Sequence, residues 1–357
     1  MGSAQSWNGW RTVMLGRTPG VGFSLDDARE EALAFEEALG QVVIGQARAI
    51  RLLTIAVFAR GHVLLEGDVG VGKTTLLRAA ARLIGGAYER VEGSVDLMPG
   101  DLVYHAWVDG DGRPRVDPGP AIRHGENLAI FFFNEINRAR PQVHSLLLRI
   151  MTERSANAFK TEYRFPYLQV FADRNRIERE ETFELPAAAR DRFFMEVGIA
   201  APSDPALRHK LIFDTRFQDA DRLIGGLKEG LIDHRALPAI ARAVQTDIRS
   251  SEAIERYTMG LWQALLRPQD HGITLDGVEM ARLILGGASP RGMAYLVQAA
   301  RVQAWLEGRT IIVPEDLQAV FFEVMAHRVF LDPVYELRRE AIIGALIPAV
   351  LASVAAP

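Results

Sequence analysis

Residues Gly67–Thr74 read G-D-V-G-V-G-K-T and satisfy the phosphate-binding pattern G-x-x-x-x-G-K-[ST] at every fixed position. A strand-like apolar run, His62–Glu66, precedes them, and a helix-like run, Thr75–Ile84, follows until Gly85 and Gly86 end it. Strand, loop and helix in this order form the context in which the pattern binds phosphate. The glycines let several backbone N–H groups face the phosphates at the positive end of the helix dipole. A glycine turn that matches by chance is the alternative, and both flanks argue against it.

The loop predicts a nucleotide and a metal ion as cofactors. Lys73 can reach the β- and γ-phosphates of ATP, and the hydroxyl group of Thr74 can coordinate Mg²⁺. The expected nucleotide-binding residues of the loop are Gly67, Val69, Gly70, Val71, Gly72, Lys73, Thr74 and Thr75.

The composition narrows the class of protein. The 357 residues suffice for two domains and a sizeable core. The net charge of −4 gives no whole-chain attraction to nucleic acid, although it leaves room for a local basic patch. Because the chain has no cysteine, disulfide bonds, thiolate metal sites and cysteine nucleophiles are excluded. A reducing cytoplasm fits, and the first 22 residues lack the apolar core of a secretion signal, so we expect a cytoplasmic location.

The last 17 residues, Ala341–Pro357, carry no charge. A membrane span needs about 20 apolar residues, and Pro348 interrupts this run. We therefore expect a C-terminal helix packed on the core, with a membrane anchor as the disfavoured alternative.

Strand and helix patterns alternate up to about residue 200, which predicts an α/β parallel sheet. The six-residue apolar run Leu128–Phe133 is typical of a strand covered on both faces. A hairpin is expected around Asp109–Gly112, and a strand pair is expected from Phe159–Arg164 with Phe165–Phe171. Helices are predicted from Ser24 to about Leu39, over Pro141–Arg154, and in segments near 204–213, 236–248, 251–267, 277–285, 291–307 and 315–328.

This change of pattern predicts the domain organisation. Residues 1–23 form an N-terminal segment that we expect to lack fixed structure. Residues 24–202 form the α/β nucleotide-binding domain, and residues 203–357 form a helical domain.

The strand Leu128–Phe133 is followed by Asn134 and Glu135. In P-loop ATPases the corresponding strand usually ends in Asp-Glu, where the Asp supports Mg²⁺ and the Glu polarises water. Glu135 is therefore the candidate catalytic base, and a helix-start carboxylate favoured by the dipole is the alternative. Asn134 is a candidate metal-site residue whose amide oxygen can hydrogen-bond a metal-bound water. It lacks the negative charge that a hard cation prefers.

Several segments resemble the MoxR family of AAA+ ATPases, in order and spacing, over roughly residues 24–346. Residues 134–139, N-E-I-N-R-A, resemble the family's D-E-I-N-R-A, and Val43, Ile44 and Gly45 resemble the start of a V-x-G-Q segment that packs near adenine. The other matching segments are 175–178, 185–186, 191–193, the G-A-S-P-R motif at 287–291, 313–316 and 327–328. The resemblance implies an α/β P-loop AAA+ core followed by an all-α lid domain.

The resemblance also implies roles for three further residues. Asn175 corresponds to sensor 1, which positions the attacking water; a turn asparagine is the alternative. Arg192 corresponds to the arginine finger that reaches a neighbouring subunit's γ-phosphate, with Arg190 as a rival and a surface salt bridge as the alternative. Arg291 corresponds to sensor 2, a lid arginine that reaches the nucleotide of its own or an adjacent site. Asn134, the sequence Asp173–Arg176 and Ala187–Ala189 depart from the family pattern, which indicates a divergent subgroup or slow hydrolysis.

By resemblance, the chain is an ATP hydrolase that forms a hexameric ring and acts as a chaperone-like remodeller that matures or activates a client protein or metalloenzyme complex. A protein with a von Willebrand factor A domain is a partner of such rings. The hairpin near 104–116 and the strand pair near 156–171 are candidate working elements, and ordinary exposed turns are the alternative. A nucleotide-gated ring scaffold with little hydrolysis is a second hypothesis, supported by Asn134. The net charge of −4 argues against a nucleic-acid motor.

Overall fold

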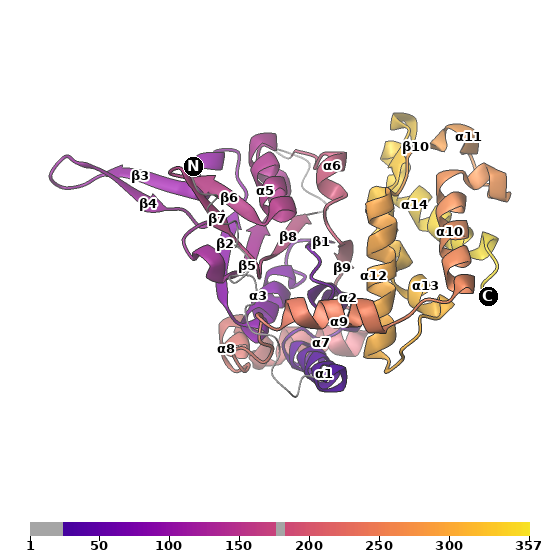
Figure 1. Cartoon of the computed structure of the whole chain (residues 1–357), viewed down its shortest axis with the longest axis horizontal. Coiled ribbons are helices and arrows are strands. Elements are labelled where there is room, and N and C mark those ends of the chain that lie inside the picture. The colour runs from indigo at the N-terminus through magenta and orange to yellow at the C-terminus, as the bar shows by residue number, and fades with distance from the viewer. Residues whose placement is uncertain (1–23, 176–182) are drawn as a thin grey trace, which may run out of the picture.

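The computed structural model describes residues 24–175 and 183–357. The predicted N-terminal segment 1–23 lies outside the described residues. Figure 1 shows a twisted sheet with helices on both faces, a hairpin that extends away from it, and a helical lid on the opposite side. The structure therefore has the predicted fold class, an α/β AAA core followed by a helical lid. The boundary between residues 202 and 203 stays a prediction.

The central sheet has five parallel strands in the order β2-β5-β8-β1-β9. The strands are β1 (Val63–Gly67), β2 (Ala87–Glu92), β5 (Leu128–Asn134), β8 (Gln169–Asn175) and β9 (Met195–Ile199). All seven residues of β5 are buried, which confirms the prediction from its apolar run. Because side chains alternate along a strand, Phe132 packs into one apolar core, and Phe131 and Phe133 pack into the other.

Helices cover both faces of this sheet. The helices up to residue 225 are α1 (Leu25–Val42), α2 (Ala47–Phe58), α3 (Lys73–Ile84), α4 (Pro99–Val103), α5 (Pro141–Glu153), α6 (Ala187–Arg190), α7 (Pro205–Phe213) and α8 (Ala220–Gly225). Ser24, the predicted start of this helix, caps α1, because its hydroxyl group accepts a hydrogen bond from the Asp26 N–H at 3.0 Å. The short 3-10 turns are η1 (Gly125–Asn127), η2 (Ile136–Arg138), η3 (Thr215–Gln218), η4 (Pro268–His271), η5 (Ala326–Arg328) and η6 (Pro333–Arg338).

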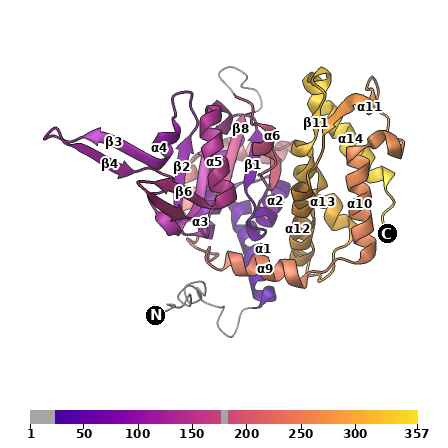
Figure 2. The ribbon, with the colours of Figure 1, turned by 45° about the horizontal axis from the view of Figure 1, so that its top comes forward.

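The lid lies beside β9 and α2 in both ribbon views (Figures 1 and 2). Its elements are α9 (Leu237–Asp247), α10 (Glu252–Leu266), α11 (Met280–Leu283), β10 (Ile284–Gly286), α12 (Pro290–Leu306), α13 (Pro314–Met325), β11 (Phe330–Leu331) and α14 (Arg339–Ser353). The helix predicted near 277–285 is largely wrong. Only Met280–Leu283 is helical there, because the next residues pair as β10 with the distant strand β11.

Two hairpins project from the core region. The first pairs β3 (Tyr104–Val108) with β4 (Pro114–Pro118), which confirms the hairpin predicted there. The strand pair predicted over Phe159–Phe171 is wrong: β6 (Ser155–Ala158) pairs with β7 (Thr161–Arg164), and β8 joins the central sheet. Phe159 and Lys160 have φ values of 51° and 64°, so they form the tight turn between β6 and β7. A Phe-Lys pair gives no sequence signal for such a turn, which explains the error.

The C-terminal helix α14 packs on the lid as predicted. Its buried side chains are Ile342, Ile343, Leu346, Ile347 and Val350. Among the described residues, no helix combines the length and the apolar character that crossing a bilayer requires.

Candidate functional site

The phosphate-binding loop connects β1 to α3, as the sequence predicts. Gly70 and Gly72 have φ values of 80° and 92°, a left-handed conformation that glycine adopts without strain. Helix α3 starts at Lys73, directly after Gly72, so its N-terminus faces the loop. The backbone therefore has the form that presents N–H groups to an anion.

The Lys73 ammonium group lies among oxygen acceptors at the end of the sheet. It donates to the carbonyl oxygens of Gly67 and Asp68 at 2.8 Å and to the Asn175 Oδ1 atom at 2.7 Å. Gly67 and Asn175 are register partners on the parallel strands β1 and β8. The sheet therefore brings the predicted sensor residue next to the lysine of the loop.

Thr74 and Asn134 also meet, although they come from different elements. The Thr74 hydroxyl group donates to the Asn134 Oδ1 atom at 3.4 Å. The Asn134 Nδ2 group in turn donates to the Glu92 Oε1 atom at 3.4 Å. These weak contacts orient the amide oxygen of Asn134 toward Thr74, as the metal-site prediction requires. Glu92 lies at the end of β2, which the sequence analysis did not identify as a strand.

Glu135 follows β5 in a left-handed conformation, with φ of 51°, which is uncommon for a residue other than glycine. Its backbone N–H donates to the Asp173 Oδ1 atom at 2.6 Å. Its carboxylate accepts hydrogen bonds from Asn175 Nδ2 at 3.3 Å and from Arg138 Nη1 at 3.1 Å. The structure therefore brings Glu135 and Asn175, the candidate base and sensor, into contact.

Asp173 is a site residue that the sequence analysis named only as a departure from the family pattern. Its side chain is 2% exposed, and burial raises the pKa of its carboxyl group. Register places it beside Asn134, because their preceding residues, Ala172 and Phe133, are partners on β8 and β5. Its position two residues before Asn175, at the end of a strand, is the signal that could have identified it.

These residues surround a cavity of about 260 Å³. It is lined by Val69, Gly70, Val71, Gly72, Lys73, Thr74, Thr75, Asn134, Glu135, Asp173 and Asn175. A hydroxyl group, an amide oxygen and two carboxylates are the oxygen donors that suit Mg²⁺. The residues present therefore fit a magnesium ion bound together with a phosphate group.

A second cavity, of about 340 Å³, shares Val69–Gly72 and Thr75 with the first and is more apolar. Val43 and Ile44 line it, as expected for residues near a base, whereas Gly45 is not among its lining residues. Leu211, Phe217 and Leu223 also line it and were missed by the sequence analysis, because they come from helices that contact the loop only in the folded chain.

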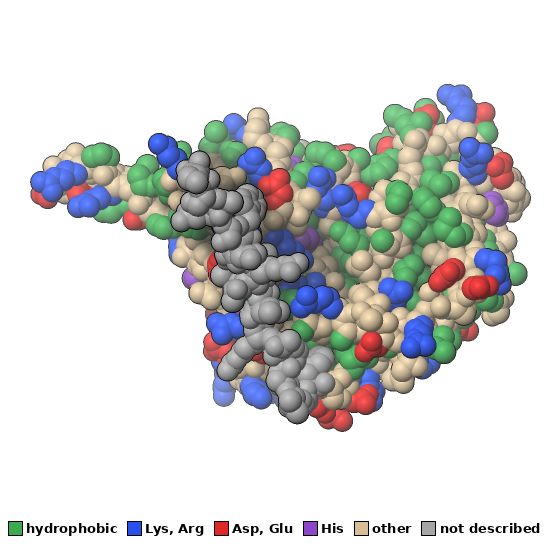
Figure 3. Space-filling model, viewed as in Figure 1, with side chains coloured by type: hydrophobic (Ala, Val, Ile, Leu, Met, Phe, Trp, Pro, Cys, Tyr) green, Lys and Arg blue, Asp and Glu red, His purple; other side chains and the backbone are tan. Residues whose placement is uncertain are grey.

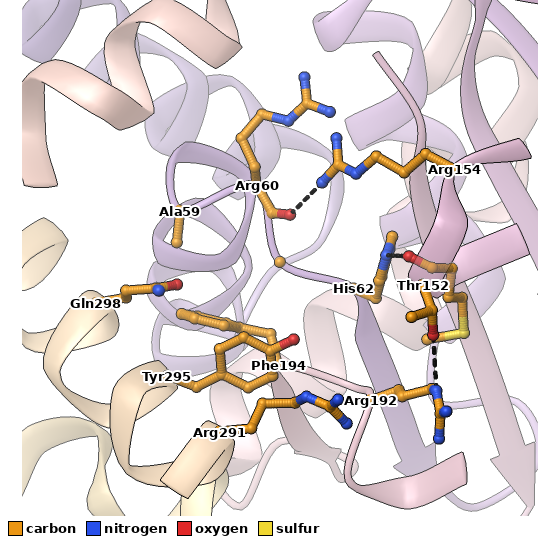
Figure 4. A pocket seen from close by; sticks show the side chains of 12 residues that line it. Ala59, Arg60, His62, Thr152, Arg154, Arg192, Phe194, Arg291, Tyr295 and Gln298 are labelled. Atoms are coloured by element: carbon orange, nitrogen blue, oxygen red, sulfur yellow. Dashed lines mark hydrogen bonds between the residues drawn. The ribbon is translucent and has the colours of Figure 1, made fainter. Parts of the chain in front are cut away.

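Arg192 and Arg291 are not among the described residues that line either of these cavities. Both line a third cavity, of about 350 Å³, between the core region and the lid (Figure 4). The rival Arg190 instead packs its guanidinium group over the Phe330 ring, 5.1 Å from the ring centre. The structure therefore separates the two predicted arginines from the phosphate loop of their own chain.

The carboxylate of Asp191 joins the segment of Arg192 to the lid. It accepts hydrogen bonds from Ser289 Oγ at 3.0 Å, from Arg291 Nη1 at 3.2 Å and from Arg328 Nε at 3.2 Å. Ser289 also caps α12, because its hydroxyl group accepts the Gly292 N–H at 3.2 Å. Arg328 is 1% exposed, so its ion pair with Asp191 helps to fix the carboxylate that contacts Arg291.

Known proteins share this architecture. Residues 62–195 match the family model "ATPase family associated with various cellular activities (AAA)", and residues 280–345 match the "AAA lid domain". A crystal structure of a proposed ATPase from Cytophaga hutchinsonii superposes with a TM-score of 0.75 at 26% identity, over 94% of this chain and 100% of that one.

Similarity in sequence identifies the family of this chain within the AAA ATPases. The chain is 65% identical to "Protein MoxR" of Methylorubrum extorquens, over 93% of this chain and 97% of the relative. It is 58% identical to "Protein MoxR" of Paracoccus denitrificans, over 90% and 95% of the two chains. It is 29% identical to "Chaperone MoxR1" of Mycobacterium tuberculosis, over 82% and 73%. The chain therefore belongs to the MoxR family of AAA ATPases, which implies ATP binding and hydrolysis.

Proposed function

We propose that this protein is a Mg²⁺-dependent ring ATPase that remodels or matures a client protein, and that its active sites are shared between neighbouring subunits. Lys73 and the loop amides bind the phosphates. Glu135 acts as the base for the attacking water, and Asn175 orients that base through its amide group. Thr74, Asn134 and Asp173 would hold Mg²⁺, which neutralises charge on the β- and γ-phosphates when bound.

The observation that carries this proposal is the division of the predicted site between two regions of the chain. Lys73, Glu135 and Asn175 line the phosphate cavity, whereas Arg192 and Arg291 line the separate cavity beside the lid. A phosphoryl-transfer site benefits from a cation that neutralises the transition state, and an arginine finger can be worth roughly 10³–10⁵ in rate. A second copy of the chain that places its arginines against the phosphate cavity completes the site. A closed ring gives every site such a neighbour.

Complementation between two inactive variants tests this arrangement. Arg192→Ala and Glu135→Ala are each expected to bind ATP and to lack turnover. In mixed rings, an Arg192→Ala subunit keeps an intact Glu135 and can receive Arg192 from a Glu135→Ala neighbour. Mixing should therefore restore part of the ATPase activity, measured as phosphate release.

A mixture of Lys73→Ala with Glu135→Ala is the matched control. Both changes damage the same half of the site, so no subunit in the mixture has both residues, and activity should stay absent. Rings that are verified as mixed, but in which Arg192→Ala and Glu135→Ala remain inactive together, would reject the shared site.

The two hairpins are the proposed client-binding elements. Figure 3 shows the β3–β4 hairpin extending from the body with apolar and basic side chains on its surface. Trp107, Val108 and Val116 of this hairpin are 44–67% exposed. Tyr104 contacts Phe159 of the β6–β7 turn, with ring centres 5.8 Å apart, so the two hairpins form one surface. Exposed apolar side chains on a projecting element are typical of a protein-binding surface.

The chaperone role is supported by the name of the relative MoxR1, and the resemblance adds a hexameric ring and a partner with a von Willebrand factor A domain. The alternative is a nucleotide-gated scaffold with little hydrolysis. Asn134 favours it, because a neutral amide replaces the usual carboxylate. Steady-state ATPase measurements separate the two, since the scaffold would assemble with ATP without turning it over.

A further inference from the structure

The cavity beside the lid has a strongly basic lining. Arg60, Arg154, Arg192 and Arg291 all line it, and none of the described residues along its wall is acidic. Figure 4 shows these side chains reaching the cavity from separate segments of the core region and from the lid. The Asp191 carboxylate, which does not line the cavity, lies 3.2 Å from Arg291 Nη1 and partly offsets the charge of Arg291. The cavity therefore carries more positive charge than Arg192 and Arg291 alone supply.

His62, which also lines the cavity, adds no charge. Its Nδ1 atom accepts the Val170 N–H at 2.9 Å, and its Nε2 atom lies 3.1 Å from the Met151 carbonyl oxygen. Burial lowers the pKa of this imidazole to about 4, so the ring is neutral at neutral pH. The basic character of the cavity comes from guanidinium groups, which stay protonated.

Arg154, like Arg60 and Arg192, lines this cavity without an ion pair to any carboxylate of the described residues. It is half-buried directly after α5, with φ of 49°, and burial lowers the pKa of its guanidinium group. Its side-chain hydrogen bonds to the described residues are long, to the carbonyl oxygens of Arg60 at 3.4 Å and Pro166 at 3.5 Å. No carboxylate of the described residues forms an ion pair with it. The C-terminal end of the α5 dipole favours a cation there without neutralising it.

Arg149, on α5, differs from Arg154 because it is exposed and has a carboxylate partner. Its side chain is 53% exposed, and its Nε atom lies 3.8 Å from the Glu153 carboxylate, as is common for a helix-surface arginine. A partly desolvated cation without a counter-ion is unfavourable until an anion binds to it. Arg60 adds a second positive charge to the cavity, and its buried Nη1 atom has no hydrogen-bond partner among the described residues.

Arg154 is also linked to the predicted arginine finger. The Arg192 Nε group donates to the Thr152 Oγ1 atom at 2.7 Å, and Thr152 lies two residues before Arg154. The end of α5 therefore holds Arg192 and carries Arg154. A phosphate group that reaches Arg192 from another subunit approaches the same end of α5.

We propose that Arg154 is a third arginine acting in trans: together with Arg192 and Arg291, it binds the terminal phosphoryl oxygens of a nucleoside triphosphate held by a second copy of this chain. This inference rests on the shared site proposed above and adds to it a residue from a different element. In phosphoryl transfer the negative charge is spread over three equatorial oxygens, so cations on several sides can stabilise it. The planar guanidinium group of an arginine can contact two such oxygens at once.

Arg154→Gln tests the proposal, because an amide can keep a donor for the nearby carbonyl oxygens while the charge is lost. Arg149→Gln is the matched control on the same helix. We expect Arg154→Gln to bind MgATP as the unmodified protein does, and to lower kcat on the order of 10- to 100-fold, the range of one charge-assisted hydrogen bond. Arg149→Gln should keep its activity. Mixing Arg154→Gln with Glu135→Ala subunits should restore turnover, as for Arg192→Ala.

Three results would overturn the proposal. Arg154→Gln could retain the full kcat, it could lose MgATP affinity in its own loop, or it could fail to be complemented by Glu135→Ala while Arg192→Ala is complemented. If neither Arg154→Gln nor Arg192→Ala is complemented by Glu135→Ala, the shared site itself is rejected. Failure of the Arg154 proposal alone is therefore distinguishable from failure of the shared site. If Arg154→Gln does not fold, Arg154→Lys carries the same test, because it keeps the charge and loses the planar fork. A lower kcat restored in mixtures supports the proposal, and an unchanged kcat overturns it.

Discussion

Replacing Asp173 with asparagine is expected to stabilise the apo protein and to lower its ATPase activity. Asp173 is 2% exposed, and its carboxylate accepts the Glu135 backbone N–H at 2.6 Å. Asparagine has nearly the same shape, and its amide oxygen can accept the same hydrogen bond. The substitution therefore removes a buried charge and keeps the geometry.

The magnitude follows from two opposing effects. A hydrogen bond to a charged acceptor contributes about 1 kcal/mol more than a neutral one, which asparagine forfeits. Burying the ionised carboxylate costs several kcal/mol, which asparagine avoids. The pKa of Asp173 is raised, chiefly by burial, so folding disfavours the ionised carboxylate relative to the neutral one, and the second effect is larger. We expect a net gain of roughly 0.5–2 kcal/mol in the free energy of unfolding, typical of removing strain at a functional site. Each kcal/mol raises Tm by about 2–4 °C in a domain of roughly 150–250 residues.

The stability difference between the two proteins should depend on pH. In the unfolded chain, aspartate has a pKa of about 3.9. Below that value Asp173 is protonated in both states, and the two proteins should be equally stable apart from the amide itself. As pH rises toward the raised folded-state pKa, only the unmodified protein loses stability, so the difference should grow and then level off.

The assay is urea unfolding of the apo proteins at pH 4 and pH 7, with ATPase rates measured at pH 7. Asp247→Asn, at an exposed position on α9, is the control and should change neither quantity. An Asp173→Asn variant that is less stable than the unmodified protein at pH 7 would show that the carboxylate is net stabilising and would refute the reasoning. Turnover should fall because the substitution removes the negative charge beside Asn134, at the proposed Mg²⁺ site.

Three further predictions follow from the site and the core. Lys73→Ala should remove most MgATP affinity, because Lys73 supplies the full charge aimed at the phosphates; unchanged binding by calorimetry would contradict this assignment. Asn134→Asp should lower the free Mg²⁺ needed for half-maximal ATPase and raise the maximal rate, since it restores a carboxylate at the end of β5; equal midpoints and rates would remove the main support for the scaffold alternative. The pKa of His62 is lowered to about 4 by burial, so stability should fall as pH drops from about 6.5 toward 4, by up to about 3 kcal/mol from this residue. In His62→Gln, the urea midpoint should therefore change less with pH in this range. An unchanged slope would show that His62 does not cause the loss of stability.

Local patterns in the sequence predicted much of the core correctly. The glycine spacing of the loop, the apolar run of β5 and the polar residues that end it each depend on a few neighbouring residues. The same is true of the Ser24 cap and the β3–β4 hairpin. The errors came where local signals were absent: the Phe159-Lys160 turn carries no glycine, and β10 exists only because β11 pairs with it.

The sequence alone determined the chemistry of the phosphate loop and of the end of β5, because motif spacing specifies backbone form and side-chain type within one strand–loop–helix unit. The tertiary structure determined which distant residues share a site. Strand register brought Asp173 to Glu135, and lid packing placed Arg291 in the cavity that Arg192 and Arg154 line. Such relations can join residues 100 or more positions apart, and they depend on strand order and domain packing, which no local pattern of residues encodes.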